Sequence, residues 1–270
     1  MTDTATTPDF DRRFGGVARL YGADALSRFR AAHVAVIGIG GVGSWVAEAL
    51  ARSAIGALTL VDLDHVAESN VNRQIHALDD TLGMAKTEAM ARRIHGINPE
   101  CQVNQVDDFV APDNLDALLG AGDFDLLVDA IDGVRAKTHL IAWCKTRRLP
   151  LVTVGGAGGQ LDPTRIRLDD LSRTVQDPLL AKVRAQLRRD HGFPRDQKKK
   201  FGVEAVYSDE PLRYPATDAA CEVDAGAAHA NAHGPTGLNC AGFGSSVCVT
   251  ASFGLAAAAA ALRQLANRPA

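Results

Sequence analysis

The sequence contains no pair of cysteines with the C-x-x-C spacing that structural zinc sites often use. Its five cysteines are widely separated, at positions 101, 144, 221, 240 and 248. Four-cysteine zinc sites draw on such pairs, and a closed disulfide framework needs an even number of cysteines. We therefore expect no structural zinc and no disulfide framework. Reduced thiols are typical of the cytoplasm, which is the compartment we predict.

The chain also lacks an apolar leader and a strong excess of either charge. Residues 1–11 are polar and acidic, without the apolar core of a secretory signal, and we interpret them as a disordered lead. The formal net charge of −3 argues against a protein that coats nucleic acid, but it permits a local basic patch. No internal repeat is visible, so residues 12–270 are expected to form a single domain.

Charged residues are absent between Leu238 and Leu262, a stretch long enough to cross a bilayer. Polar residues such as Asn239 and Thr250 interrupt this stretch. A helix that is apolar all round is also what a protein core or a subunit interface requires. We therefore expect a buried helix and no membrane association, with a bilayer span as the alternative.

Short apolar runs alternate with segments of helical pattern through the first part of the chain. The expected strands are 33–38, 57–62, 101–110, 124–132 and 149–158, and the expected helices are 12–31, 44–54, 80–98, 113–122 and 134–148. Such alternation, with short turns between the elements, is typical of a doubly wound parallel sheet. The predicted fold class is therefore α/β.

The alternation ends after Gly159. The elements expected beyond it are a hairpin-like excursion at 159–172, a helix at 177–190, a strand at 201–208 and loops over 209–236. We therefore divide the domain into a nucleotide-binding core, residues 30–158, and a substrate-side elaboration, residues 159–270, made of strands, loops and the apolar helix.

A glycine-rich turn joins the first predicted strand to the next helix. Gly38, Gly40, Gly41 and Gly43 form the pattern G-x-G-G-x-G. Glycines there let the backbone approach a phosphate, and the following helix N-terminus attracts an anion. Asp62 ends the next strand, where its carboxylate can accept both ribose hydroxyls. Because NAD and ATP share that ribose, these residues alone leave an NAD-dependent oxidoreductase open.

Further polar residues follow in an order that favours a triphosphate. They are Asp64, Asn70, Arg73, Gln74, Lys86 and Asp132. Arg73 and Lys86 can neutralise phosphate oxygens, and Asp132 can hold Mg²⁺ against them. A hydride-transfer site needs none of these charges, so the set favours ATP and Mg²⁺ as cofactors. Arg73, Lys86 and Asp132 are the candidate catalytic residues.

The ordered motifs D-x-D, S-N-x-x-R-Q, G-x-x-K and D-x-x-D behind G-x-G-G-x-G resemble those of the ubiquitin-activating-enzyme-like adenylating enzymes. The resemblance covers roughly residues 12–160 and implies a Rossmann-like domain that works as a homodimer. It implies ribose binding by Asp62, phosphate contacts by Asn70, Arg73 and Lys86, and metal binding by Asp132. The R-x-x-R of the relatives' N-terminal arm is incomplete here, which leaves Arg13 or Arg19 as substitutes.

Further segments are similar to one branch of that superfamily, the bacterial tRNA threonylcarbamoyladenosine dehydratases. They include RFGGVARLYG (13–22), NRQIHAL (72–78), VDDFVAPDN (106–114) and GGAGGQLDPT (155–164). The resemblance implies that ATP adenylates the side-chain carboxylate of a modified adenosine in tRNA. The neighbouring carbamoyl group then displaces AMP and closes a ring, with net loss of water. Activation of a small sulfur-carrier protein and a non-catalytic nucleotide-binding scaffold are the alternatives.

The sequence gives less detail about binding partners than about the nucleotide site. A basic segment suited to RNA phosphates comprises Arg184, Arg188, Arg189, Arg195, Lys198, Lys199 and Lys200. The same resemblance implies a cysteine desulfurase and its sulfur acceptor as partners, for which Cys221 and Cys240 are candidate thiols. His76, His229 and His233 show no metal-ligand spacing.

Overall fold

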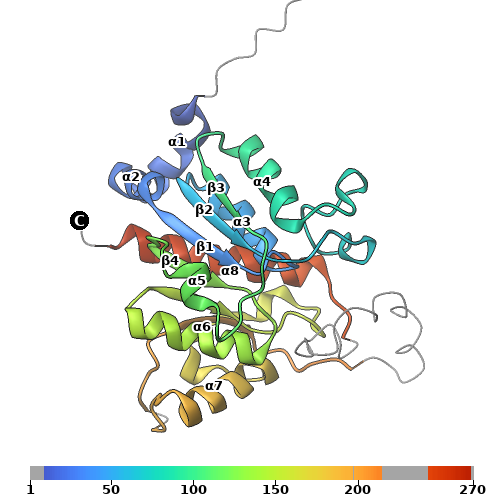
Figure 1. The fold of residues 1–270 in the computed structure, drawn as a ribbon, viewed down its shortest axis with the longest axis vertical. Coiled ribbons are helices and arrows are strands. Elements are labelled where there is room, and N and C mark those ends of the chain that lie inside the picture. Colours follow the sequence, from blue (N-terminus) through green and yellow to red (C-terminus); the bar gives the residue numbers. More distant parts are fainter. Residues whose placement is uncertain (1–8, 197, 215–242, 269–270) are drawn as a thin grey trace, which may run out of the picture.

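A computed structural model of the chain describes residues 9–196, 198–214 and 243–268. Seven strands form one sheet in the order β3-β2-β1-β4-β5-β7-β6, with helices on both faces (Figure 1). The strands are β1 His33–Ile37, β2 Ala57–Val61, β3 Gln102–Val106, β4 Leu126–Asp129, β5 Leu151–Val154, β6 Ile166–Asp170 and β7 Glu204–Ser208. All neighbouring pairs are parallel except β7 and β6. The predicted α/β fold is confirmed, with the correction that the sheet is mixed.

Both faces of the sheet are covered. The helices are α1 Phe10–Tyr21, α2 Ala23–Ala31, α3 Gly43–Arg52, α4 Lys86–Ile97, α5 Leu115–Leu119, α6 Val134–Arg147, α7 Pro178–Asp190 and α8 Val247–Ala266. In β1, Val34 and Val36 pack with α3 and α8, whereas Ala35 and Ile37 pack with α6 and α7. Burial of both faces explains why the strands appear in the sequence as continuous apolar runs.

The N-terminal arm differs from the expectation in two ways. It is broken into α1 and α2 at Gly22, whose φ of 91° is open to glycine at little cost. The lead expected to be disordered over 1–11 is too long, because α1 begins at Phe10. The Asp9 carboxylate caps that helix by accepting the Arg12 N–H.

The helix expected at 80–98 begins only at Lys86. The preceding residues turn back on the segment after β2, since the Gly83 N–H donates to the Val66 carbonyl and the Val66 N–H donates to Met84. Gly83 adopts a φ of 79° in this turn. The result is that Lys86 starts a helix directly beside Asp64, whose carbonyl accepts the Lys86 N–H at 3.0 Å.

The region 159–172 is not a local hairpin. Its residues 166–170 form β6, which pairs antiparallel with β7 across a long connection that contains α7. The Asp170 carboxylate fixes this pairing by accepting the N–H groups of Phe201 and Gly202. Strands from the region after 159 therefore extend the same sheet as β5.

The apolar helix predicted within 238–262 is α8, which begins at Val247 with Ser246 as its cap. Residues 238–242 lie outside the described part of the chain. α8 crosses behind the sheet in Figure 1 and packs tightly on α3: a Cβ at Gly254 would lie 2.6 Å from the Val42 carbonyl oxygen. Among the described residues, α8 is the one helix that is long and apolar enough to cross a membrane. Its inner face is buried in the core, as expected.

Candidate active site

A cavity of about 1190 Å³ opens at the carboxyl ends of β1, β2, β4 and β5. In the sheet β1 lies between β2 and β4, and the direction in which the chain adds strands reverses at this point. Open α/β sheets bind ligands at such a switch point. The predicted residues on its wall are Gly38, Gly40, Gly41, Asp62, Asp64, Asn70, Arg73, Gln74, Lys86 and Asp132. The structure therefore brings together residues from five separate segments.

The glycine turn is built for close packing as well as for ligand approach. Gly43 is not on the cavity wall; a Cβ there would lie 1.7 Å from the Gly38 carbonyl oxygen. Gly38 itself has a φ of 87° and lies against the Ala130 carbonyl. A Cβ at Gly40 would meet no atom within 4 Å, so that position stays open toward the cavity.

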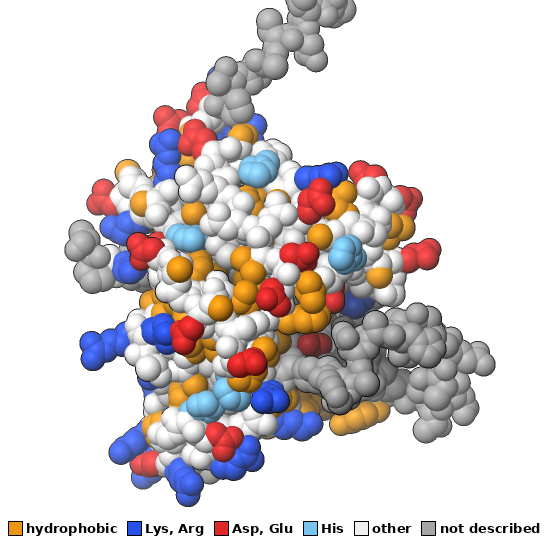
Figure 2. Space-filling view, in the orientation of Figure 1, with side chains coloured by type: hydrophobic (Ala, Val, Ile, Leu, Met, Phe, Trp, Pro, Cys, Tyr) orange, Lys and Arg blue, Asp and Glu red, His pale blue; other side chains and the backbone are white. Residues whose placement is uncertain are grey.

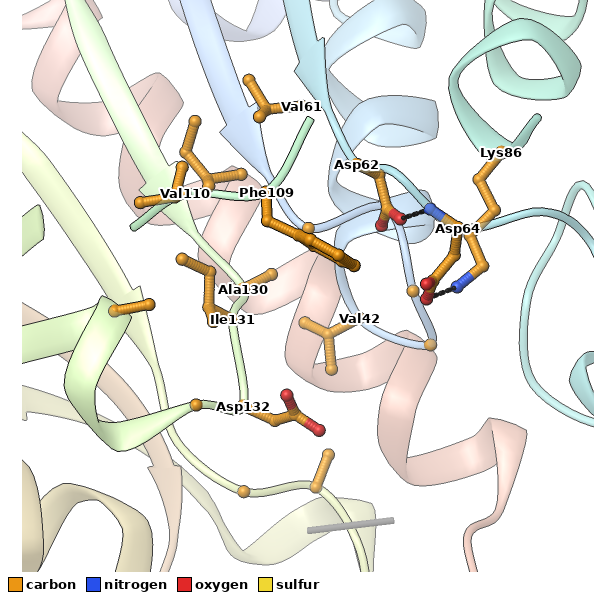
Figure 3. Close-up of a pocket in the computed structure, with 18 of the residues that line it drawn as sticks. Val42, Val61, Asp62, Asp64, Lys86, Phe109, Val110, Ala130, Ile131 and Asp132 are labelled. Carbon is orange, nitrogen blue, oxygen red and sulfur yellow. Dashed lines mark hydrogen bonds and ion pairs between the residues drawn. The ribbon is translucent and has the colours of Figure 1, made fainter. Parts of the chain in front are cut away.

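Asp62 is held by backbone donors at the end of β2. One carboxylate oxygen accepts the Ile39 N–H at 2.6 Å, and the other accepts the Asp64 N–H at 2.9 Å. Burial raises the pKa of Asp62, an effect that the Lys86 ammonium and the two backbone donors oppose. The carboxylate faces the cavity in Figure 3, in a position to accept further hydrogen bonds.

Lys86 reaches the cavity from the first position of α4. Its Nζ lies 2.7 Å from an Asp64 carboxylate oxygen, an ion pair that is marked by a dashed line in Figure 3. The lysine side chain is only 7% exposed, whereas that of Asp64 is 57% exposed. The Asp64 carboxylate therefore holds the Lys86 ammonium at the cavity wall. Because solvent can still reach this ion pair, an incoming anion can also bind the ammonium.

Arg73 lies across the glycine turn. A Cβ at Gly41 would come within 3.2 Å of the arginine's aliphatic carbons, and the guanidinium donates to the Ser69 carbonyl and to Asn72. Asn70 closes the turn before it by accepting the Ala67 N–H. The Gln74 side chain is buried on the wall, and its carbonyl oxygen has no partner among the described residues.

The two acids of the D-x-x-D motif occupy different environments. Asp132 is exposed, and its carboxylate projects into the cavity opposite Asp62 and Lys86 (Figure 3). Asp129 is fully buried and bonds to Lys137, to the Thr153 hydroxyl and to the Ile131 N–H. The motif therefore supplies one residue for the cavity and one for the interior beneath it.

Sequence reasoning missed several wall residues. They are Phe109, Arg135, Phe243, Ser245, Thr250 and the glycine-rich run 155–158. The Phe109 ring, 48% exposed, lies between Val42 and Asp62 in Figure 3. The segments around Phe109 and the glycine run were among those that resemble the dehydratases, and this was a usable signal. Thr250 and its neighbours carried none, because α8 is distant in the sequence.

The segment before α8 closes one side of the cavity. The Ser245 carbonyl accepts a hydrogen bond from Asn72, beside Arg73, and the Gly244 carbonyl accepts the Gly159 N–H. The Thr250 hydroxyl, in the first turns of α8, is buried and has no partner among the described residues. The helix predicted as a core element thus also contributes to the site.

The basic segment 184–200 is exposed only in part. The side chains of Lys198, Lys199 and Lys200 face solvent, and Lys and Arg residues gather over the α6–α7 end of the face seen in Figure 2. In contrast, Arg184 bonds to Thr174, and Arg188 stacks on Phe201. Two of the seven predicted residues, Arg184 and Arg188, are therefore engaged within the fold, and binding of RNA by the others stays a prediction.

Arg13, Arg19 and His76 do not line the cavity of their own chain. Arg13 donates to the Ile97 carbonyl at the end of α4, and Arg19 is exposed. His76 is buried with both ring nitrogens unpartnered among the described residues, and burial lowers its pKa to about 4. Cys221, Cys240, His229 and His233 lie outside the described residues.

The chain is similar in sequence and fold to known proteins. The tRNA threonylcarbamoyladenosine dehydratase of Escherichia coli (strain K12) is 54% identical over 256 residues, which are 94% of this chain and 93% of that protein. Crystal structures of the E. coli tRNA N6-threonylcarbamoyladenosine dehydratase in complex with ATP and with AMP each match with a TM-score of 0.83 and 49% identity, covering 96% of both chains. The family model described as "ThiF family" matches residues 12–269, and the chain belongs to that family.

Proposed function

We propose that the protein dehydrates threonylcarbamoyladenosine in tRNA, using ATP to adenylate the side-chain carboxylate. The observation that carries the proposal is one cavity that joins a nucleotide-binding wall to a second wall at β4, β5 and α8. The 54% identity to a dehydratase over nearly the whole of both chains supports this reading over activation of a sulfur-carrier protein.

The first wall fits ATP. The glycine turn and the N-terminus of α3 face the phosphates, and Asp62 accepts the ribose hydroxyls. Arg73 lies against the turn at Gly41, Lys86 stands at the first position of α4, and both neutralise the β- and γ-phosphates. When ATP binds, the Lys86 ammonium is shared between the Asp64 carboxylate and the phosphate oxygens.

The second wall fits Mg²⁺ bound between protein and nucleotide. Asp132 offers an exposed carboxylate, and the described residues contain no group of three or more potential metal ligands. Mg²⁺ is commonly held by one or two carboxylates together with phosphate oxygens and water, so a single acid suffices. When bound, the ion draws charge from the phosphate oxygens.

The reaction balances without a catalytic cysteine. A carboxylate oxygen attacks the α-phosphorus, and pyrophosphate leaves. The carbamoyl group of the same side chain then attacks the acyl carbon, and AMP departs with the former carboxylate oxygen. The substrate loses the elements of water and gains a ring. Because the nucleophile belongs to the same side chain, the enzyme needs only to hold it close and keep water out.

The partners follow from the same proposal. The exposed lysines 198–200 supply contacts to RNA phosphates. A homodimer is supported by apolar side chains on the surface: Leu20 is 78% exposed and Leu255 is 50% exposed. A cysteine desulfurase and its sulfur acceptor rest on the family resemblance alone, and the cytoplasmic location rests on the odd number and wide spacing of the cysteines.

The test uses the full chain with ATP, Mg²⁺ and tRNA carrying threonylcarbamoyladenosine. Nucleoside masses after digestion should fall by one water, with one AMP formed per event. A sulfur-carrier protein ending in Gly-Gly, offered instead, should release no pyrophosphate. Pyrophosphate release with the carrier, together with no pyrophosphate or AMP from the modified tRNA, would replace the proposed function by the alternative.

A further inference from the structure

The cations on the two walls of the cavity differ in whether they contact polar groups of the protein. On the nucleotide wall, Lys86 is paired with Asp64, and Arg73 donates to Ser69 and Asn72. On the opposite wall, at the start of α6, stands a third cation, Arg135. It lies three residues after Asp132 and lines the same cavity.

Arg135 makes no ion pair with any residue that the structure describes, although the Asp132 carboxylate lines the same cavity. Its side chain is exposed, and no described residue forms a hydrogen bond with its guanidinium. By contrast, Arg147 at the other end of the same helix pairs with Asp116, and Arg92 on α4 pairs with Glu88.

The position of Arg135 near the amino end of α6 also favours an anionic ligand. Arg135 is the second residue of α6, and the first turn of that helix contains no acidic residue. The amino end of a helix carries partial positive charge, so a cation there is disfavoured unless an anion lies nearby. An anionic ligand in the cavity would satisfy both the guanidinium and the helix end.

The proposed chemistry supplies such an anion. Adenylation brings a carboxylate up to an α-phosphate, and these two anions repel each other more strongly as water is excluded. Arg73 and Lys86 are already committed to the nucleotide side. The cavity, at about 1190 Å³, exceeds the roughly 300–1,000 Å³ of usual small-molecule sites, which leaves room for a second ligand beside ATP.

We propose that Arg135 is a specificity-determining residue for the RNA substrate, and that it pairs with an anionic oxygen of the modified nucleotide. This inference rests on the proposed function. The oxygen belongs either to the side-chain carboxylate or to a phosphate next to that nucleotide, since a guanidinium recognises both. In either case Arg135 does not contact ATP.

The experiment compares Arg135→Gln and Arg135→Lys with Arg92→Gln, which removes the same charge from an exposed site outside the cavity. Dissociation constants are measured for ATP, for tRNA carrying threonylcarbamoyladenosine and for the same tRNA with unmodified adenosine. Thermal melting confirms that each variant folds. Turnover of the wild-type enzyme is measured in parallel, so that failure of the proposed function is recognised separately.

Arg135→Gln should raise the dissociation constant for the modified tRNA by about tenfold or more and leave that for ATP within about twofold. If the partner is the carboxylate, binding of the unmodified tRNA is unchanged. If the partner is a phosphate, both RNAs weaken equally and the salt dependence flattens. Arg135→Lys should recover part of the loss, because it keeps the charge without the planar fork.

Two results would overturn the inference while the proposed function stands. One is an active wild-type enzyme whose Arg135→Gln variant binds both RNAs as tightly as Arg92→Gln does. The other is an equal loss of ATP affinity, which would place Arg135 on the nucleotide. A wild-type protein that forms no AMP with the modified tRNA would instead refute the proposed function.

Discussion

The ammonium nitrogen of Lys137 lies 2.7 Å from an Asp129 carboxylate oxygen, and both side chains are fully buried. The pair joins the end of β4 to the second turn of α6, and the Thr153 hydroxyl on β5 bonds to the same carboxylate. Asp132 and Arg135 both lie in the segment between these two residues. The buried pair therefore fixes the shape of the loop that presents them to the cavity.

Removing one partner of this pair should be costly. Lys137→Met leaves the Asp129 carboxylate buried without its cation, and we expect a loss of about 3–5 kcal/mol in the free energy of unfolding. The double variant Lys137→Met with Asp129→Asn should recover part of the loss, because the uncompensated charge is gone. Chemical denaturation measures both, and equal stability of the two variants would show that the charge is not the cause.

Asp132→Asn should leave the fold intact and lower turnover by about 100-fold or more, because the Mg²⁺-bound phosphates lose their protein ligand. Raising the Mg²⁺ concentration should recover little of the activity. Asp80→Asn, an equal change at an exposed site in the turn before Lys86, serves as the control and should turn over like the wild type. Near-normal activity of Asp132→Asn would remove this residue from the site.

Buried His76 should make the stability depend on pH. Above pH 6.5 the imidazole is neutral in both the folded and the unfolded protein. Between pH 6.5 and about 4 the unfolded chain binds a proton that the folded protein excludes. The free energy of unfolding therefore falls with falling pH in this window, by up to roughly 1.4 kcal/mol per pH unit.

The variant His76→Gln isolates this contribution. Its stability should fall less steeply than that of the wild type between pH 6.5 and 4, and the two slopes should be equal above pH 6.5. Urea denaturation at several pH values measures the slopes. Parallel curves across the whole range would mean that the imidazole already titrates normally in the folded protein.

Lys198, Lys199 and Lys200 are exposed and free to meet RNA phosphates. Changing all three to Ala should weaken tRNA binding and flatten its salt dependence, by up to about 0.9 units of log-log slope for each lost duplex contact. ATP affinity should not change, because Arg73 and Lys86 act elsewhere. Unaltered tRNA affinity and slope would make this segment an ordinary solvated loop.

The parts of the site that the sequence predicted well are those encoded locally. The glycine turn and Asp62 each follow a strand directly, so their placement at the sheet edge needed only the strand pattern. Spacing alone could not distinguish Asp129 from Asp132, since their environments depend on Lys137 and Thr153.

What the sequence did not predict depends on contacts between distant residues. The start of α4 was misplaced because residues 83–85 turn back on the segment after β2 instead of continuing a helix. The antiparallel β6 was missed because its partner β7 follows only after α7. The contribution of Ser245 and Thr250 to the cavity required knowledge of how α8 packs on α3.

The central claim is that the carboxylate of the substrate attacks ATP at the α-phosphorus. The most direct measurement labels that carboxylate with heavy oxygen in the modified tRNA and determines where the label goes during a single turnover. Attack by the carboxylate should leave one heavy oxygen in each AMP and none in pyrophosphate or orthophosphate. Unlabelled AMP, or heavy oxygen released in phosphate, would contradict it.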